Sequence, residues 1–234
     1  MKVLKFGGTS VGSAQRIKDV ARLVQQRGKN IIVLSAMSGT TNQLVEISGY
    51  LYNHNIAGAR ECINALEQKY LGVIDELYSS EDYKQKAREV VGACLDYIRA
   101  FTKEVFTLFE EKAILSQGEL MSTNMMHLYL QEQGVNSVLL PALDFMRLDK
   151  HSEADSHYIR EKLTKILAEH QDTGYSGCIV VNVPEQQVWV NEDTGAGMSL
   201  YCFPFLAVME VAASGAADPW ETLLAKYPSA KMSG

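Results

Sequence analysis

Short apolar runs recur along the chain and predict the strands of a sheet. The run over residues 30–34 is continuous and rich in β-branched residues. A strand of this kind is buried on both faces, as in a parallel sheet that helices cover on each side. Shorter runs over residues 1–4, 137–140, 178–181 and 188–190 predict further strands.

Between these runs, apolar residues recur at the spacing of amphipathic helices. Such patterns begin at about residue 13 and after Asn42, and others lie within residues 119–133 and 158–170. A strand, a polar turn and a helix therefore occur twice in succession at the start of the chain. This order favours an α/β fold with a parallel sheet.

Two long helical patterns fill residues 56–112, and the polar stretch 79–82 between them offers N-cap residues for the second helix. The apolar positions of the second pattern extend as far as Val105 and Leu108. We interpret this segment as a helical hairpin inserted into the α/β series, and we assign it a structural role.

The turn after the first strand, Lys5-Phe6-Gly7-Gly8-Thr9-Ser10, has the features of an anion site. Two adjacent glycines let the backbone come close to a bound group, and the unpaired N–H groups at a helix start favour an anion. Lys5 adds a full positive charge. An ordinary turn, in which the glycines only allow tight packing, explains the same residues equally well.

A second polar turn, Ser35 to Asn42, follows the second strand. Polar turns at the carboxyl ends of parallel strands share one edge of the sheet, where open α/β folds bind ligands. Further along, Glu119 follows a glycine near a helix start, where it could complement the helix dipole or bind an ammonium group. His127 lies alone inside the same helical pattern, and we assign it a structural role.

Composition and charge narrow the class of protein. An apolar content of 47% over 234 residues is enough to form a sizeable core. The net charge of −6 makes nucleic acid a poor candidate for a partner. No run approaches the roughly 18 to 20 apolar residues that cross a bilayer, and no signal-peptide pattern precedes the first strand. The four scattered cysteines form no CxxC pair, which predicts a reduced, cytoplasmic protein.

Three motifs in this order resemble those of aspartate kinase, an enzyme of the amino-acid kinase family. They are Lys5-Phe6-Gly7-Gly8-Thr9-Ser10-Val11, Leu34-Ser35-Ala36-Met37-Ser38-Gly39-Thr40-Thr41-Asn42 and Ser116-Gln117-Gly118-Glu119-Leu120-Met121-Ser122. Each lies at the end of a predicted strand or the start of a predicted helix, and the predicted hairpin separates the second from the third. The resemblance covers about residues 1–170. It implies a three-layer α/β/α sandwich with a mainly parallel sheet.

The same resemblance implies an activity. The chain would transfer the γ-phosphate of ATP to the β-carboxylate of L-aspartate, the first step towards lysine, threonine and methionine, with Mg²⁺ required by the chemistry of ATP. The positions that match ATP-binding residues are Lys5, Phe6, Gly7 and Gly8, and Lys5 is also the expected catalytic residue. The positions that match substrate contacts are Ser35, Thr41 and Glu119, of which Glu119 would receive the amino group. No residue is assigned to a metal.

Beyond about residue 172 the chain departs from this pattern. The Arg-Gly-Gly-Ser-Asp-Tyr segment that binds substrate in aspartate kinases has no counterpart here, and neither have the regulatory domains that usually follow. We therefore expect one catalytic domain over residues 1–234, truncated or divergent at its C-terminal end, with L-aspartate and ATP as its partners and a homo-oligomer as one possible state. An inactive or fragmentary homologue that retains an aspartate pocket, and another amino-acid kinase, stay open as alternatives.

Overall fold

The computed structural model describes residues 2–26, 30–103, 105–147, 154–171, 178–182, 188–190 and 197–199. Of the predictions for the chain after residue 172, the two strands fall within these ranges, and the divergent or truncated end lies outside them.

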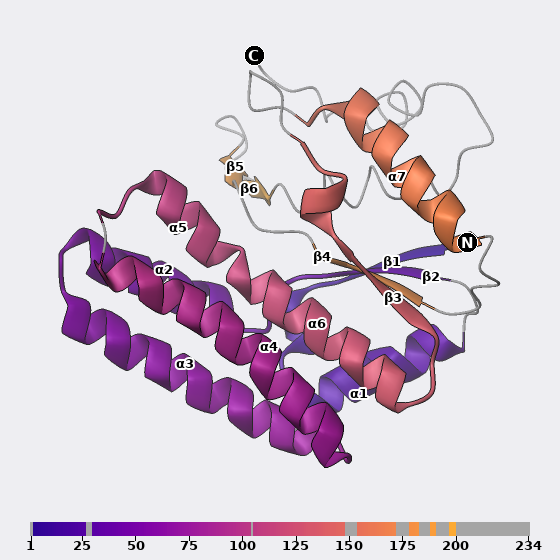
Figure 1. Ribbon diagram of the computed structural model, residues 1–234, viewed down its shortest axis with the longest axis horizontal. Helices are drawn as coiled ribbons and strands as arrows, with labels where there is room; N and C mark the ends of the chain where they lie inside the picture. The colour runs from indigo at the N-terminus through magenta and orange to yellow at the C-terminus, as the bar shows by residue number, and fades with distance from the viewer. Residues whose placement is uncertain are drawn as a thin grey trace.

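A four-stranded parallel sheet forms the centre of the fold (Figure 1). Its strands are β1 (Lys2–Phe6), β2 (Asn30–Leu34), β3 (Ser137–Pro141) and β4 (Cys178–Asn182), in the spatial order β1-β2-β4-β3. All neighbouring pairs are parallel, which confirms the α/β class and the parallel sheet. The short strands β5 (Val188–Val190) and β6 (Gly197–Ser199) form a separate antiparallel pair.

Helices cover both faces of this sheet. Successive side chains of β2 point to opposite faces and therefore enter two different apolar cores. Ile32 and Leu34 join the larger core, which also contains residues of α1 (Ala14–Gln25), α2 (Thr40–Tyr52) and α6 (Gln117–Glu132). Ile31 and Val33 join a smaller core under α7 (Ser156–Gln171). Figure 1 shows α7 on the side of the sheet opposite α1 and α6. The result is the expected three-layer α/β/α arrangement.

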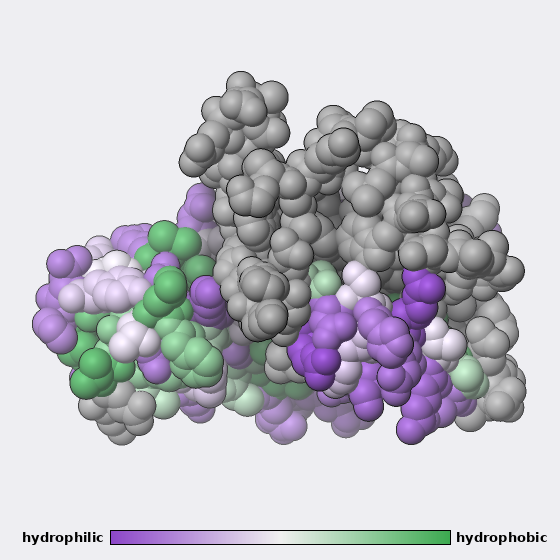
Figure 2. Space-filling model, turned by 90° about the horizontal axis from the view of Figure 1, so that it is seen from above, coloured by the Kyte–Doolittle hydropathy of each residue, from purple (hydrophilic) through white to green (hydrophobic). Residues whose placement is uncertain are grey.

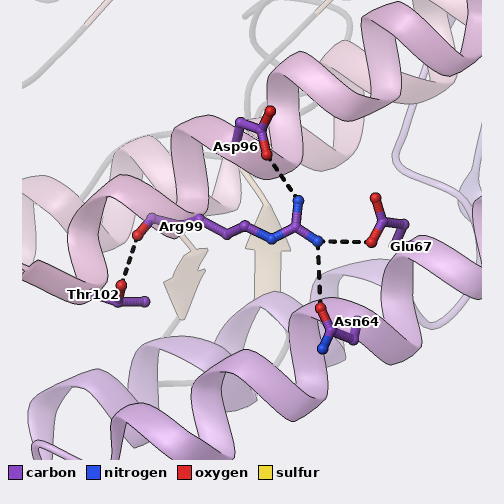
Figure 3. Close-up of polar contacts among 5 residues, drawn as sticks. All are labelled: Asn64, Glu67, Asp96, Arg99 and Thr102. Carbon is purple, nitrogen blue, oxygen red and sulfur yellow. Dashed lines mark hydrogen bonds and ion pairs between the residues drawn. The ribbon is translucent and has the colours of Figure 1, made fainter.

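The predicted hairpin consists of α3 (Ile56–Leu77) and α4 (Glu81–Ala100). Its helices pack on each other, α3 also packs on α2, and α4 packs on α6. Arg99 of α4 joins the two helices: its guanidinium donates to Glu67 of α3 at 2.7 Å and to Asn64 at 3.4 Å (Figure 3). Asp96 on the same helix accepts from Arg99 at 2.9 Å. The Arg99 contacts therefore hold the two helices of the hairpin together, and their packing on α2 and α6 holds the hairpin against the α/β layers.

The second helix of the hairpin is shorter than the apolar pattern predicts. It ends at Ala100, and a 3-10 turn over Phe101–Lys103 follows. A separate helix, α5 (Leu108–Leu115), begins at Thr107, whose hydroxyl accepts from the Phe109 N–H while Glu110 accepts from the Thr107 N–H. This capping box starts a new helix, so Val105 and Leu108 are 81% and 61% exposed instead of facing the core.

The exposed apolar residues around α5 are visible at the surface. Figure 2 shows hydrophobic residues gathered at the end of the molecule where α2 and α5 lie. Val45 and Tyr52 of α2 and Phe109 of α5 are exposed there.

Within the described ranges, no helix has both the length and the apolar character needed to cross a membrane.

Candidate functional site

The turns that follow β1 and β2 lie side by side at the carboxyl ends of these strands. Hydrogen bonding continues past the sheet, because the Phe6 carbonyl accepts from the Ser35 N–H at 3.1 Å. One step further, the Gly8 carbonyl accepts from the Ser38 N–H, also at 3.1 Å. The first two motifs therefore form one surface at the edge where open α/β sheets bind ligands.

Gly7 and Gly8 serve this surface in different ways. A Cβ on Gly8 would lie 2.6 Å from the carbonyl oxygen of Ala36, which is closer than side chains come to backbone. Gly8 is therefore required for the close packing of the two turns. A Cβ on Gly7 would meet nothing within 4 Å. Gly7 is not needed for packing, and it leaves the backbone open to an approaching group.

The first turn differs from the expected helix start. Residues Gly8–Val11 form a 3-10 turn, in which the Ser10 N–H donates to the Gly7 carbonyl at 2.9 Å. The helix α1 begins only at Ala14, and the Ser13 hydroxyl accepts from its Arg16 N–H at 3.4 Å. The Arg16 N–H at the start of α1 is thus capped by Ser13, and the glycines do not open directly into this helix.

An open depression of about 260 Å³ lies beside the 3-10 turn. It is lined by Thr9, Ser10, Arg16, Asp19 and Val20. The Arg16 guanidinium donates to the Thr9 carbonyl at 2.5 Å and so holds the turn from the side of α1. Lys5, on β1, is exposed next to this turn, whereas Phe6 is partly buried against the larger core.

Glu119 connects the third motif to the second turn. Its side chain is fully buried (0% exposed) in the first turn of α6, and Oε1 accepts from the Ala36 N–H at 3.1 Å. The Ser122 hydroxyl, one helical turn on, donates to the Ser35 carbonyl at 2.9 Å. A Cβ on Gly118 would lie 2.8 Å from the Ala36 Cβ, so Gly118 allows α6 to approach this closely. The three motifs therefore meet around residues 35–36.

Ser35 and Thr41 occupy the two ends of the second turn. Ser35 is half-buried, with its N–H bonded to the first turn and its carbonyl bonded to α6. Thr41 is half-buried in the first turn of α2. Hydrogen bonds to the main chain thus join Phe6 and Gly8 to the second turn, which contains Ser35, and join that turn to Glu119. Lys5 is exposed at the surface.

Two residues of the helical hairpin that no sequence motif marks, Lys69 and Tyr70, also reach this turn. The Lys69 Nζ donates to the Ser38 carbonyl at 2.7 Å and to the Thr40 hydroxyl at 3.3 Å. The buried Tyr70 hydroxyl is 3.1 Å from the same Thr40 oxygen. Burial, followed by the nearby Glu119 charge, raises the pKa of Tyr70 well above its usual range. Both residues lie within the helical pattern of the hairpin, whose spacing marks neither of them as part of a site.

Among the described residues, no group of three or more histidine, cysteine or acidic side chains could hold a metal ion. The chemistry that this surface offers is therefore that of glycine-rich backbone, hydroxyl groups, lysines and one buried carboxylate.

Comparison with known proteins places this arrangement in a family. A model of the amino acid kinase family matches residues 1–199. The chloroplastic aspartokinase 2 of Arabidopsis thaliana is 31% identical over 159 residues, which are 65% of this chain and 29% of that protein. The aspartate kinase of Pseudomonas putida is 50% identical over 50 residues, which are 20% of this chain and 12% of that protein.

Solved structures agree on the fold. The crystal structure of E. coli aspartokinase III in complex with aspartate and ADP superimposes with a TM-score of 0.69 at 19% identity, over 92% of this chain and 47% of that one. The present chain therefore spans less than a third of the length of the curated relatives that match it over most of its sequence, and about half of the E. coli structure. These matches confirm the resemblance that the three motifs indicated, and the chain belongs to the amino acid kinase family.

Proposed function

We propose that this chain is the catalytic part of an aspartate kinase, which transfers the γ-phosphate of ATP to the β-carboxylate of L-aspartate. The observation that carries the proposal is the position of Glu119. Its buried carboxylate is bonded to the turn after β2, which is itself bonded to the glycine turn after β1. The Glu119 carboxylate, which attracts an ammonium group, therefore lies near the glycine turn, whose backbone attracts anions. A site that binds an amino acid next to a nucleotide requires both features.

The proposed roles follow from the chemistry of the reaction. A carboxylate acceptor is already ionised, so the enzyme has to neutralise and align two anions rather than remove a proton. Lys5 and the backbone of Phe6, Gly7 and Gly8 would hold the ATP phosphates, and Lys5 would stabilise the charge on the transferred group. Ser35 and Thr41 would contact the aspartate carboxylates, and Glu119 would pair with its ammonium.

The nucleotide would approach the open side of Gly7, where no described residue other than its chain neighbours would lie within 4 Å of an added Cβ. Mg²⁺ would neutralise the phosphate charge, and it is commonly held by the phosphates, water and only one or two carboxylates. The similar E. coli aspartokinase III was crystallised as a complex with aspartate and ADP, which supports the same ligands here. The product would be the acyl phosphate that begins the route to lysine, threonine and methionine.

A second candidate is a protein that binds aspartate but does not transfer phosphate. The sequence favours it at one point, since no Arg-Gly-Gly-Ser-Asp segment follows residue 172. The residues proposed to contact aspartate all lie within the first three motifs, so they do not depend on that segment.

Replacement of Glu119 by glutamine tests the proposal. The Glu119→Gln side chain keeps its shape and the oxygen that accepts from Ala36, but it loses the charge that would bind an ammonium. We expect the KM for aspartate, measured by trapping the acyl phosphate as a hydroxamate, to rise about thirtyfold or more, as loss of a buried charge pair implies. The KM for ATP should change little.

Glu132→Gln is the matched control. Glu132 lies at the other end of α6, and its Oε1 accepts from the N–H groups of Ser79 and Ser80 at 2.9 and 2.7 Å. This variant should retain the aspartate KM of the parent chain. The proposal is contradicted by an absence of hydroxamate above a Lys5→Ala background, or by an unchanged aspartate KM in Glu119→Gln.

A further inference from the structure

Lys69 of α3 reaches out of the helical hairpin to the turn that follows β2. The side chain is half-buried, and its Nζ donates to the Ser38 carbonyl at 2.7 Å and to the Thr40 hydroxyl at 3.3 Å. Both acceptors belong to the second motif, so the inserted hairpin touches the proposed substrate site directly.

The turn that Lys69 holds is sharp and is fixed from two sides. Gly39, between the two acceptors, has a φ of +77°, and a Cβ there would lie 3.6 Å from the Lys69 Nζ. On the opposite side, the Ser38 N–H donates to the Gly8 carbonyl at 3.1 Å. The Ser38 peptide groups therefore link Lys69 to the glycine turn. Movement of Lys69 would remove the hydrogen bond between α3 and the Ser38 carbonyl and loosen the contact of the second turn with the first.

The neighbouring residue strengthens this hold. The Tyr70 hydroxyl is 3.1 Å from the Thr40 hydroxyl oxygen, which is also the second acceptor of Lys69. Two successive residues of α3 thus converge on the first residue of α2. Tyr70 is uncharged and buried, so Lys69 is the member of this pair that brings charge to the turn.

The positive charge of Lys69 lies in a place that is electrostatically unfavourable for a cation. Thr40 is the first residue of α2, and a cation near a helix N-terminus is unfavourable because it faces the positive end of the dipole. In the described part of the chain, Lys69 takes part in no ion pair with a carboxylate. Burial lowers the pKa of its ammonium, which again reflects an environment unfavourable to the charge. An anion bound at this turn would relieve both effects.

We infer that Lys69 is a positioning residue for the acceptor half of the site, which fixes the Ser38–Thr40 turn and raises its affinity for an acceptor that carries two carboxylates. The inference rests on the proposed function, because it takes the acceptor to be a dicarboxylic amino acid. It assigns part of the substrate affinity to the hairpin.

The test compares Lys69→Met with Lys69→Arg in the full chain. Calorimetry measures the affinity for aspartate, and steady-state kinetics measure the KM values for aspartate and for ATP. We expect Lys69→Met to weaken aspartate binding about tenfold or more, the effect of losing a charged hydrogen bond, with less than about a threefold change in the KM for ATP. Lys69→Arg keeps the charge and should restore affinity to within about threefold of the parent chain.

Lys18→Met is the matched control for the loss of a lysine. Lys18 is also half-buried, and its Nζ also donates to a main-chain carbonyl, that of Glu76 at 2.6 Å, two helical turns along α3 from Lys69. Its replacement should leave aspartate binding unchanged. If Lys69→Met does not fold, as judged by its thermal melt, Lys69→Gln replaces it and should show the same tenfold loss.

The outcomes separate the inference from the proposed function. If the parent chain binds no aspartate, the proposed function is wrong and the inference falls with it. If the parent chain binds aspartate and Lys69→Met binds it equally well, the inference alone is overturned. An equal rise in the KM values for aspartate and for ATP in Lys69→Met would also overturn the inference, since that pattern indicates a general loss of structure.

Discussion

Gly7 and Gly8 are adjacent in the sequence, but they face different surroundings. Gly8 lies against the Ala36 carbonyl of the neighbouring turn, whereas the space beside Gly7 is open. The sequence left a phosphate cradle and a tight turn as equal alternatives for this pair. The structure gives the tight-turn role to Gly8, and the role of Gly7 remains tied to the proposed nucleotide.

Alanine at each position should therefore have a different effect. In Gly8→Ala the new methyl group would lie 2.6 Å from a carbonyl oxygen, so we expect a loss of about 1–3 kcal/mol in the free energy of unfolding. Gly7 has a φ of −77°, which alanine adopts without strain, so Gly7→Ala should stay within about 0.5 kcal/mol of the parent chain. Denaturant unfolding measures both values.

The Gly7→Ala variant also tests the proposed position of the nucleotide. A methyl group on Gly7 would fill the open approach, so Gly7→Ala should weaken ATP binding while the fold is retained. If Gly7→Ala binds ATP as tightly as the parent chain, the phosphates are not held at Gly7.

At the scale of helices and strands, the apolar pattern predicted most elements correctly. The run over residues 30–34 is indeed a strand with both faces buried, because its alternate side chains enter two different cores. The end of α4 was not predicted. Val105 and Leu108 continue a helical apolar pattern, yet the capping box at Thr107 starts a new helix in that stretch. A local hydrogen-bond pattern here outweighs apolar periodicity.

The candidate site was likewise predictable only in part. Motifs along the sequence identified the two turns and Glu119, since each follows a strand or begins a helix. The contribution of Lys69 was not predictable, because it depends on how α3 packs against α2 and leaves no mark on the spacing of residues. Tertiary contacts between elements far apart in the sequence have to be seen in the structure.

The contact between α6 and β3 makes stability depend on pH. His127 of α6 is half-buried, its Nδ1 is 2.9 Å from the Ser137 hydroxyl of β3, and burial lowers the pKa of its imidazole. An unfolded histidine titrates near 6.5, so below about pH 6.5 the unfolded chain binds this proton more readily than the folded one. The contribution of His127 to stability is therefore complete above pH 6.5 and is lost as the pH falls towards its folded-state pKa.

Replacement of His127 by asparagine, whose amide can reach Ser137 from a similar position, removes this proton. The free energy of unfolding of His127→Asn should fall less steeply than that of the parent chain between pH 6.5 and about 5. Chemical denaturation at a series of pH values measures the two slopes. Identical slopes for His127→Asn and the parent chain would contradict the assignment.

At the scale of the whole molecule, the two halves of the proposed site depend on different parts of the chain. The proposed contacts to aspartate lie in the turn after β2, on α2 and on α6, and the larger core joins these elements to the hairpin. The proposed contacts to ATP come from the end of β1, where Lys5 is exposed, and from the glycine turn that follows it. Separate measurement of the two ligands can therefore distinguish a kinase from a protein that only binds aspartate.

Thermal unfolding of the full chain provides that measurement. A ligand present at a hundred times its Kd adds about 2.7 kcal/mol to the free energy of unfolding, which raises the Tm of a domain of this size by roughly 5–11 °C. For an aspartate kinase we expect aspartate and Mg²⁺-ATP each to raise the Tm, and Glu119→Gln to abolish only the shift caused by aspartate. D-aspartate serves as the control for the chirality of the pocket. A shift with L-aspartate but none with Mg²⁺-ATP would reject the kinase and support the binding protein, because the acceptor contacts would then be intact without a nucleotide site beside them.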